Sequence, residues 1–346
     1  MISVIVPVRN DPGHLRACLE SLAATRGVLD REVIVVDDAS TDDSAAVAAA
    51  LGARVLRLER RLGPAAARNL GAEAAHGEVV FFVDADVCVH PETVGQVVAA
   101  FAADPGIDAL FGSYDRQPGA PNFLSQYKNL FHHFVHQQGS SEASTFWSGC
   151  GAVRRSVFLE MGGFDTSYAR PCIEDIELGA RLRRAGRRIV LRKDIQARHL
   201  KRWTLAGIVR SDVWDRGVPW TELILREGSL PDDLNLRLAQ RVSAVLAYLL
   251  MAALLAAAWR PFGRGLATWL SLASLLLLAI VALNRRFYAF FSGERGPLFA
   301  ARVVPLHVLY YLYSGVALAI GVVRHVWKTK VRHASKMKVA PGAPAP

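Results

Sequence analysis

The sequence predicts an α/β domain with a doubly wound, mostly parallel sheet, followed by C-terminal transmembrane helices. Short apolar runs alternate with helical patterns through the first 200 residues, which is typical of a parallel sheet covered by helices. Residues 79–83 form an unbroken apolar run, as expected of a strand buried on both faces. After Leu238, three apolar segments at 242–259, 266–283 and 303–323 are each long enough to span a membrane.

Within the first 200 residues, each element has its own pattern. The predicted strands are apolar runs at 2–6, 33–36, 54–58, 79–83 and 187–191. The predicted helices carry apolar residues at helical spacing and cover 14–24, 42–51, 63–75, 122–138 and 173–185. Pro7 ends the first strand, and Thr41 or Asp42 could cap the second helix.

Composition narrows the class of protein. A chain of 346 residues is expected to contain more than one domain, and its 52% hydrophobic content is high for a soluble protein. The net charge of +10 fits either nucleic acid or an anionic membrane surface. The four cysteines form no Cys-x-x-Cys pair, which favours a reducing cytosol over a disulfide scaffold or a zinc site. A strand that begins at residue 2 leaves no room for a signal peptide.

Two carboxylates follow the buried strand at 79–83. Ligands bind at the carboxyl ends of parallel strands in open α/β sheets. Asp84 and Asp86, two residues apart on extended chain, are expected to point the same way and to present oxygens to one divalent ion. Oxygen ligands suit Mg²⁺ or Mn²⁺, which usually bind together with substrate phosphates. Two aspartates in a turn are also common without any ligand.

The kind of nucleotide site can be narrowed at the end of the first strand. A dinucleotide-binding fold has Gly-x-Gly-x-x-Gly there. Residues 7–13 read Pro-Val-Arg-Asn-Asp-Pro-Gly instead, which excludes a dehydrogenase of that type. The glycine-rich basic loop of a sugar-activating nucleotidyltransferase is missing as well.

Two further stretches could carry function. His132, His133 and His136 lie on the predicted helix at 122–138, and we expect a solvated or acceptor-facing histidine patch, since no zincin glutamate follows His132. Gly149 and Gly151 interrupt a strand-like run at 145–152, where glycine usually marks a bulge or a close approach of the backbone.

Seven short motifs, taken in order, resemble the family 2 glycosyltransferases, which are inverting enzymes with a GT-A fold. The motifs are IVPVRN at 5–10, VDDASTD at 36–42, RNLG at 68–71, DAD at 84–86, GGFD at 162–165, ED at 174–175 and His199. Together they extend over about residues 1–205. The resemblance implies a GT-A catalytic domain at 1–200 and a nucleotide-sugar donor.

The resemblance also implies roles for individual residues. Donor binding would involve Pro7, Val8, Asn10, Asp37 or Asp38, Arg68, Asp84, Ala85 and Asp86. Asp84 and Asp86 would hold Mn²⁺ or Mg²⁺, with His199 as an extra metal ligand. Asp175 would be the catalytic base, with Glu174 beside it as the second catalytic candidate. Trp147, Gly149 and Gly151 are predicted on the acceptor side.

The chain departs from the family pattern at two places. Arg9 stands where the family often has an aromatic residue, so contacts to the nucleotide can differ. Processive synthases carry Gln-x-x-Arg-Trp, whereas this chain has His199 in place of the glutamine before Arg202 and Trp203. This substitution favours a single transfer over polymerisation, with His199 near the metal.

The C-terminal part reads as a membrane region. Residues 201–236 mix aromatic and basic residues as in an amphipathic interfacial helix, although such a helix can also pack on a soluble domain. About three membrane helices are expected at 237–325, followed by a basic, partly disordered tail at 326–346. Three spans would place the basic tail opposite the N-terminal domain, against the positive-inside tendency, unless one segment is re-entrant or interfacial.

These features together favour a membrane-bound glycosyltransferase that moves a single sugar to a lipid-linked or other membrane-associated acceptor. A lipid or glycolipid is the expected acceptor, and a polyprenyl-phosphate sugar synthase is the alternative. The catalytic domain is expected to face the cytoplasm from a multi-pass position in the cytoplasmic membrane. A non-catalytic membrane scaffold is a reading of another class. Nucleic acid is not expected as a partner, because much of the positive charge adjoins the apolar segments, where anionic lipid explains it better.

Overall fold

The computed structural model describes residues 1–28, 30–228, 237–259 and 265–338, with side chains as far as residue 331. The chain forms two compact units whose residues alternate along the sequence. Of the described residues, the first unit comprises 1–28, 30–208, 237 and 284–303, and the second comprises 209–228, 238–259, 265–283 and 304–338.

The first unit is built on one eight-stranded mixed sheet with the order β3-β2-β1-β4-β7-β6-β8-β5. The strands are β1 (Ile2–Val8), β2 (Arg31–Asp37), β3 (Arg54–Arg57), β4 (Val79–Val83), β5 (Val87–Val89), β6 (Ala109–Tyr114), β7 (Cys150–Arg154) and β8 (Ile189–His199). β1 pairs in parallel with β2 and β4, and β2 with β3. β7 runs antiparallel between β4 and β6, and β5 runs antiparallel to β8. The predicted doubly wound, mostly parallel sheet is confirmed.

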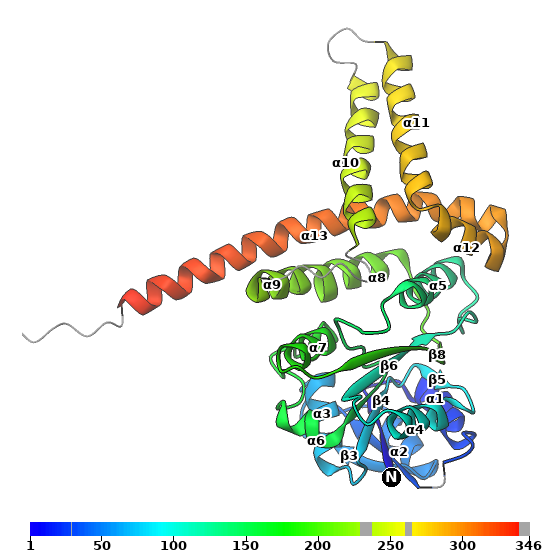
Figure 1. Ribbon diagram of the computed structural model, residues 1–346, viewed down its shortest axis with the longest axis vertical. Helices are drawn as coiled ribbons and strands as arrows, with labels where there is room; N and C mark the ends of the chain where they lie inside the picture. Colours follow the sequence, from blue (N-terminus) through cyan, green and yellow to red (C-terminus); the bar gives the residue numbers. More distant parts are fainter. Residues whose placement is uncertain (29, 229–236, 260–264, 339–346) are drawn as a thin grey trace, which may run out of the picture. The chain divides into compact units, whose positions relative to one another are not determined.

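Helices cover both faces of this sheet (Figure 1). They are α1 (Pro12–Ala23), α2 (Ser44–Ala50), α3 (Pro64–Ala74), α4 (Thr93–Ala103), α5 (Phe123–Gln138), α6 (Arg155–Glu160) and α7 (Glu174–Arg184). α12 (Arg285–Arg295) belongs to the same unit and packs on α5, with Phe287 against Phe131 at 5.2 Å between ring centroids.

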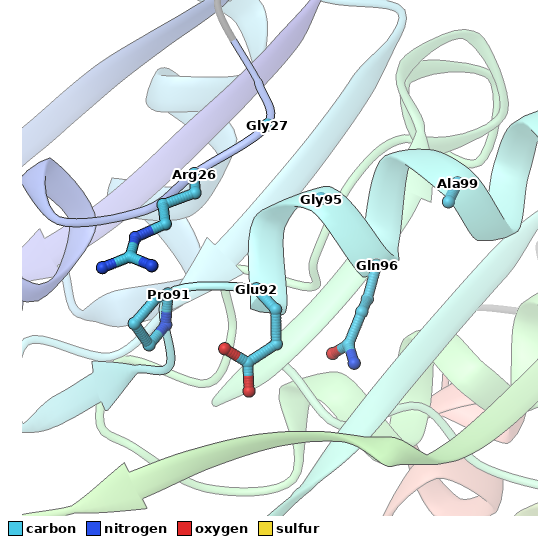
Figure 2. A pocket seen from close by; sticks show the side chains of 7 residues that line it. All are labelled: Arg26, Gly27, Pro91, Glu92, Gly95, Gln96 and Ala99. Carbon is cyan, nitrogen blue, oxygen red and sulfur yellow. The ribbon is translucent and has the colours of Figure 1, made fainter.

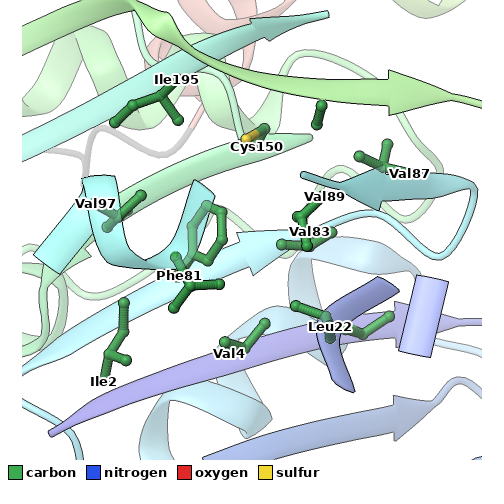
Figure 3. Packing of buried hydrophobic residues seen from close by; sticks show 14 of the residues in the cluster. Ile2, Val4, Leu22, Phe81, Val83, Val87, Val89, Val97, Cys150 and Ile195 are labelled. Carbon is green, nitrogen blue, oxygen red and sulfur yellow. The ribbon is translucent and has the colours of Figure 1, made fainter. Parts of the chain in front are cut away.

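The two faces of the sheet carry separate cores, because side chains alternate along each strand. On one face, Ile2 and Val4 of β1 join Phe81 of β4 and Val97 of α4 (Figure 3). On the other face, Ile5 packs with Phe82 and with residues of α3, α6 and α7. A strand that is apolar at every position, as β4 is, therefore follows from burial on both sides.

Several elements were not predicted. The sequence reading contained neither β5, β6, α4 nor α6, and it ended the last strand at residue 191 although β8 continues to His199. This extension matters because Tyr114 and Ala197 pair in register and bring His199 beside β5.

Gly71 shows why the RNLG motif has its glycine. A Cβ atom added at Gly71 would lie 2.5 Å from Cγ2 of Ile5, a fully buried residue of β1. The glycine thus lets α3 lie close against β1 and holds Arg68, one turn earlier, over the end of the sheet.

We expect Gly71→Ala to lower the free energy of unfolding by about 1–3 kcal/mol, because the new methyl group overpacks a core that has no room to move. Thermal unfolding of the detergent-solubilised protein measures the change. Gly13→Ala is the matched control, since Gly13 lies in α1 and a Cβ there meets nothing within 4 Å. Equal melting temperatures for the two variants would contradict the packing role of Gly71.

The second unit is helical. α8 (Leu205–Arg210) leads into a π-helix, η1 (Ser211–Gly217), and then α9 (Val218–Glu227). α10 (Leu238–Trp259) and α11 (Leu266–Leu283) pack on each other, and α13 (Pro297–Lys338) enters this unit at Val304. Three helices among the described residues are long and apolar enough to cross a membrane: α10, α11 and Pro297–Val331 of α13.

Candidate active site

The loops that follow β1 and β2 are tied to each other. Pro7 and Val8 end β1, and the Val8 carbonyl accepts the backbone N–H of Asp38 at 2.9 Å. Asn10 has a positive φ of 53° and accepts the Thr41 N–H on its side chain at 2.8 Å. Ala39 also has a positive φ, 54°, which costs a non-glycine residue about 1–3 kcal/mol and is characteristic of functional sites.

Asp37 and Asp38 are both buried, but their carboxylates have different partners. Asp38 accepts the backbone N–H groups of Leu62 and Gly63 at 2.6 and 3.0 Å, so it fixes the loop before α3. Asp37 accepts the Ser40 N–H at 2.9 Å with one oxygen, and its other oxygen lies 3.3 Å from Nε of Arg57. Because both carboxylate oxygens of Asp38 are bound to the loop before α3, Asp37 is the favoured candidate for the nucleotide contact.

Arg68 joins two of the predicted motifs. Its guanidinium donates to Asp84 at 2.7 Å and to Glu174 at 2.9 Å, and its side chain is 5% exposed. Burial lowers the pKa of Arg68, but Asp84 and Glu174 raise it further, so the net shift is upward and the cation is retained. The buried guanidinium of Arg68 therefore holds the DAD loop, residues 84–86, beside the start of α7.

The DAD loop itself is not extended. The Val87 N–H donates to the Asp84 carbonyl at 2.9 Å, which closes a turn between β4 and β5. The expectation that Asp84 and Asp86 point the same way along extended chain is therefore wrong. The chain must turn here because β5 pairs with β8, so Asp84 faces Arg68 while Asp86 faces His199 and Ala85 lies between them.

Asp86 and His199 form the second polar centre. Nε2 of His199 lies 3.3 Å from Oδ2 of Asp86, and Nδ1 lies 2.6 Å from Oδ1 of Asn129. The ring of His199 stacks on Tyr114 with 4.4 Å between centroids. Burial raises the pKa of Asp86, but attraction and a hydrogen bond from His199 outweigh it and set the pKa at about 2.

Asp175 has the environment of a proton acceptor. Its Oδ2 accepts from the backbone N–H and the hydroxyl of Ser148 at 3.1 and 3.2 Å. Burial, followed by the neighbouring charge of Glu174, raises the pKa of Asp175 to about 6. A carboxylate with this pKa is ionised at neutral pH and is more basic than an ordinary aspartate.

The neighbouring glutamates are bound within the fold. Glu174 accepts from Arg68 with one oxygen and from the Cys172 N–H with the other at 2.9 Å. Glu177 pairs with Arg181. These bonds favour a positioning role for Glu174 and leave Asp175 as the candidate base.

The predicted acceptor-side residues lie next to these carboxylates. The Asp84 N–H donates to the Gly149 carbonyl at 3.4 Å, and Trp147 packs edge-on against Tyr114 at 4.8 Å. A Cβ at Gly149 would lie 2.6 Å from the indole of Trp147, and one at Gly151 would lie 2.2 Å from its carbonyl oxygen. Both glycines thus make room for Trp147.

Of the two alternatives for the histidine patch, the solvated one is wrong for His133 and His136, and the acceptor-facing one stays a prediction. His133 and His136 are buried, His132 stacks on Tyr114, and His136 packs on Trp147. Nδ1 of His133 lies 2.6 Å from the Tyr114 carbonyl, and burial lowers its pKa. The histidines lie on α5, which contacts β6 and β8 of the sheet on one side and α12 on the other. Their rings take part in this packing around Tyr114 and Trp147.

Comparison with known proteins now identifies the domain. Residues 3–162 match the model of the glycosyl transferase family 2. Residues 3–162 form a family 2 glycosyltransferase domain.

This glycosyltransferase domain has named relatives. Over 179 residues the chain is 28% identical to an uncharacterised glycosyltransferase of Haemophilus influenzae, covering 48% of this chain and 57% of the relative. Over 201 residues it is 31% identical to the pre-mycofactocin glycosyltransferase of Mycobacterium tuberculosis, covering 54% and 40%. The chain thus spans about half the length of the curated relatives it matches.

A solved structure shares the fold of the glycosyltransferase. It is a mannosyltransferase from Pyrobaculum calidifontis in complex with GDP-Man and Mn²⁺, with a TM-score of 0.51 and 19% identity over 94% of this chain and 87% of that one. The likeness confirms the predicted GT-A fold.

Three residues of the candidate site were not predicted from the sequence. Asn129, Tyr114 and Ser148 contact His199 or Asp175, yet none belongs to a recognisable motif. Asn129 stood in a predicted helix among aromatic residues, and Tyr114 in a strand that was not predicted. The pairing of β6 with β8 brings Tyr114 to His199, whereas Asn129 reaches the site from α5 and Ser148 from the loop before β7.

A shallow hollow lies elsewhere on the glycosyltransferase domain, between the end of α1 and α4 (Figure 2). It is lined by Arg26, Gly27, Pro91, Glu92, Gly95, Gln96 and Ala99. None of the predicted site residues lines it, so it adds nothing to the candidate site.

Proposed function

We propose that this protein is a membrane-bound, metal-dependent glycosyltransferase that transfers a single sugar from a nucleotide-sugar donor, with inversion, to a lipid-linked or other membrane-associated acceptor. The observation that carries the proposal is the link through Arg68. One buried guanidinium joins Asp84, on the predicted donor side, to Glu174, whose neighbour Asp175 is the candidate base.

The donor is proposed to lie along the carboxyl ends of β1, β2 and β4. Asn10, Asp37 and the backbone at Pro7 and Val8 would bind the nucleoside, and Arg68 would lie near the diphosphate. The mannosyltransferase with the same fold is in complex with GDP-Man and Mn²⁺, which supports a nucleotide sugar and a divalent metal.

The polar groups around His199 fit a divalent metal. Because Oδ1 of Asn129 can only accept, the His199 Nδ1 donates to it, so Nε2, which faces the Asp86 carboxylate, is the nitrogen that would give its lone pair to a metal. Nε2 of His199 and Oδ2 of Asp86 lie 3.3 Å apart and could bind one metal ion together, and a hydrogen-bond acceptor on Nδ1 is typical of metal-binding histidines.

Among the described residues, no three His, Cys, Asp or Glu side chains cluster as a complete metal site. Asp86 and His199, with Asp84, would therefore hold Mn²⁺ or Mg²⁺ together with donor phosphates. When bound, such a metal would neutralise charge on the leaving nucleoside diphosphate.

Asp175 would take the proton from the acceptor hydroxyl. Ser148 orients its carboxylate by two hydrogen bonds, and Glu174 with Arg68 fixes the start of α7. Trp147 would form a wall of the acceptor site. If the acceptor is a lipid phosphate, as in a polyprenyl-phosphate sugar synthase, the acceptor oxygen is already ionised and the base matters less.

The proposal is tested by a donor screen on the detergent-solubilised full chain. Release of nucleoside diphosphate from UDP-, GDP- and dTDP-sugars is followed with Mn²⁺ and with EDTA, beside Asp86→Ala. Mn²⁺-dependent release from one donor, lost in the variant, is the expected result. If no donor releases nucleoside diphosphate and the wild type binds none of the donors, a membrane scaffold that keeps only the fold is favoured.

We expect Asn129→Ala to weaken Mn²⁺ binding about 10–100-fold, because His199 loses the acceptor that fixes its tautomer and ring orientation. Electron paramagnetic resonance of free Mn²⁺ measures the affinity without any reaction. Asn122→Ala, at the start of the same helix, is the matched control, since Asn122 donates to the Trp203 carbonyl instead. Equal affinities for the two variants would contradict the role of Asn129.

A further inference from the structure

α13 runs beside the helical segment 205–227 within the second unit. The Tyr313 hydroxyl donates to Asp212 at 2.7 Å, and farther along both segments Glu222 pairs with Arg324 at 3.0 Å and Lys328 at 2.5 Å. Both partners advance in the same direction along the chain. Residues 313–328 of α13 therefore lie along 212–222 rather than crossing them at one point.

Small residues allow this close contact. A Cβ added at Gly217 would lie 2.7 Å from Cβ of Ala317, and one at Gly321 would lie 2.6 Å from Cβ of Thr221. The contact residues are four apart on each helix, which is the spacing that brings one helical face against another. The two helices are thus held together over several turns.

The segment 205–227 cannot lie inside the hydrocarbon core of a membrane. Its charged residues are Arg210, Asp212, Asp215, Arg216, Glu222, Arg226 and Glu227. Charges at the centre of a bilayer are costly, because the hydrocarbon core cannot hydrate them. Leu205, Trp214 and Leu225 are nevertheless exposed. Exposed apolar residues on a highly charged helix fit the membrane surface.

The length of α13 then excludes a crossing. Residues 313–328 must share the depth of their charged neighbour, and residues 297–312 extend only about 24 Å at 1.5 Å per residue. The hydrocarbon core is about 30 Å thick. In addition, the start of α13 contacts α5 within the first unit. Phe299 packs on Phe123 at 4.7 Å, and Arg302 lies over the same ring at 4.1 Å.

Contacts with α10 place the middle of α13 beside the first three turns of α10. Gln240, in the first turn of α10, accepts from the Tyr311 hydroxyl at 2.6 Å, and Tyr248 donates to the Leu312 carbonyl at 2.7 Å. α13 lies across the pair in Figure 1. The start of a spanning helix lies at the membrane surface, and so does Tyr311, which contacts Gln240 there. Tyr248 lies in the third turn, but helical side chains tilt toward the N-terminus, so its ring extends back toward the same end of α10.

We propose that, of the three apolar helices described, α10 and α11 span the membrane, and that α13 lies flat in the headgroup region beside α8, η1 and α9. Its partner is an anionic phospholipid surface: Val316, Val323 and Trp327 are exposed on one face, while the sequence from 324 to 338 is rich in lysine and arginine. The inference rests on the proposed membrane association but not on the proposed transfer reaction.

This arrangement removes the conflict over orientation. With two spans, the basic residues before α13 and those near its end lie on the same side of the membrane as the catalytic unit. That distribution follows the positive-inside rule, which three spans would break.

Substituted cysteines test the sidedness in the full chain. Ser167→Cys marks the catalytic unit, Trp259→Cys marks the far end of α10, and Lys330→Cys marks the end of α13. Spheroplasts and inverted vesicles are treated with an impermeant maleimide, with the unaltered chain as the blank. We expect Lys330→Cys to label from the same side as Ser167→Cys and from the side opposite to Trp259→Cys. Labelling of Lys330→Cys from the Trp259 side would overturn the proposal.

Depth measurements distinguish a flat helix from a re-entrant one. Nitroxide labels at 316, 323 and 327 are read in vesicles of phosphatidylethanolamine and phosphatidylglycerol. A flat α13 keeps all three at one depth, whereas a tilted or inserted helix separates the outer two by up to about 16 Å. Labels at 270 and 278 of α11 are the matched control and should differ in depth by about 12 Å.

Unequal depths along α13 would overturn the proposal even where the sidedness agrees. A chain recovered only in the soluble fraction would overturn it together with the membrane association. Neither result bears on the donor screen, so failure of this proposal is distinguishable from failure of the transferase proposal.

Discussion

Asp175→Asn is expected to lower kcat for sugar transfer to a hydroxyl acceptor by about 10²–10⁴-fold, the usual contribution of a general base. The amide has the same shape and can still accept from Ser148, but it cannot take a proton. Initial rates with a saturating donor measure the change. Glu177→Gln is the matched control, because Glu177 lies on the same helical turn and its carboxylate binds Arg181.

The pH profile gives a second readout of the same residue. Burial and Glu174 raise the pKa of Asp175 to about 6, and only the deprotonated carboxylate can accept a proton. The rate should therefore rise with pH through about 6 and then level off, and this inflection should vanish in Asp175→Asn. A variant that keeps both the rate and the inflection on a hydroxyl acceptor would exclude Asp175 as the base.

The same substitution separates the two acceptor chemistries. A lipid phosphate is already ionised, so Asp175→Asn should weaken that transfer far less than transfer to a hydroxyl. The comparison needs only two acceptors and one variant. It therefore tests the nature of the acceptor as well as the role of the residue.

The parallel half of the sheet could be predicted because burial on both faces leaves a simple pattern. Val79–Val83 is apolar at every position, and the loops after such strands collect the polar motifs. The antiparallel part has no such pattern. β6 contains Gly112 and Ser113, and β8 mixes charged with apolar residues, so neither stands out as a buried strand.

The candidate site could be predicted as a set of residues but not as a geometry. Sequence placed Asp84 and Asp86 together, whereas the turn that closes at Val87 directs Asp84 to Arg68 and Asp86 to His199. Sequence also grouped Glu174 with Asp175. Arg68, 106 residues away in the chain, binds the Glu174 carboxylate. Asp175 is therefore the candidate base of the two.

For the C-terminal apolar helices, too, the sequence pattern predicts the elements but not their contacts. Hydropathy identifies α10, α11 and α13 equally, because it counts side chains without their neighbours. The partners of α13 decide its proposed position, and the ion pairs of Glu222 with Arg324 and Lys328 are formed between residues about 100 positions apart.

Asp86→Ala is expected to lower metal-dependent release of nucleoside diphosphate by about 10²–10³-fold, the cost of removing one group that stabilises developing charge. Asp86 is the stronger choice than Asp84 for this test. Asp84 also neutralises buried Arg68, so its removal would disturb α7 and the base, whereas Asn129 and Tyr114 still hold His199 when Asp86 is removed.

Three measurements together define the role of Asp86. Mn²⁺ binding should weaken in Asp86→Ala, the melting temperature should stay close to that of the wild type, and excess Mn²⁺ should restore part of the rate. Asp104→Ala is the matched control, since it removes a carboxylate that pairs with Arg188 at the surface. Unchanged Mn²⁺ affinity would place the metal elsewhere. A rate lost beyond rescue with normal Mn²⁺ binding would instead make Asp86 a contact to the donor sugar, because the two functions proposed for this carboxylate differ in whether metal can compensate for its loss.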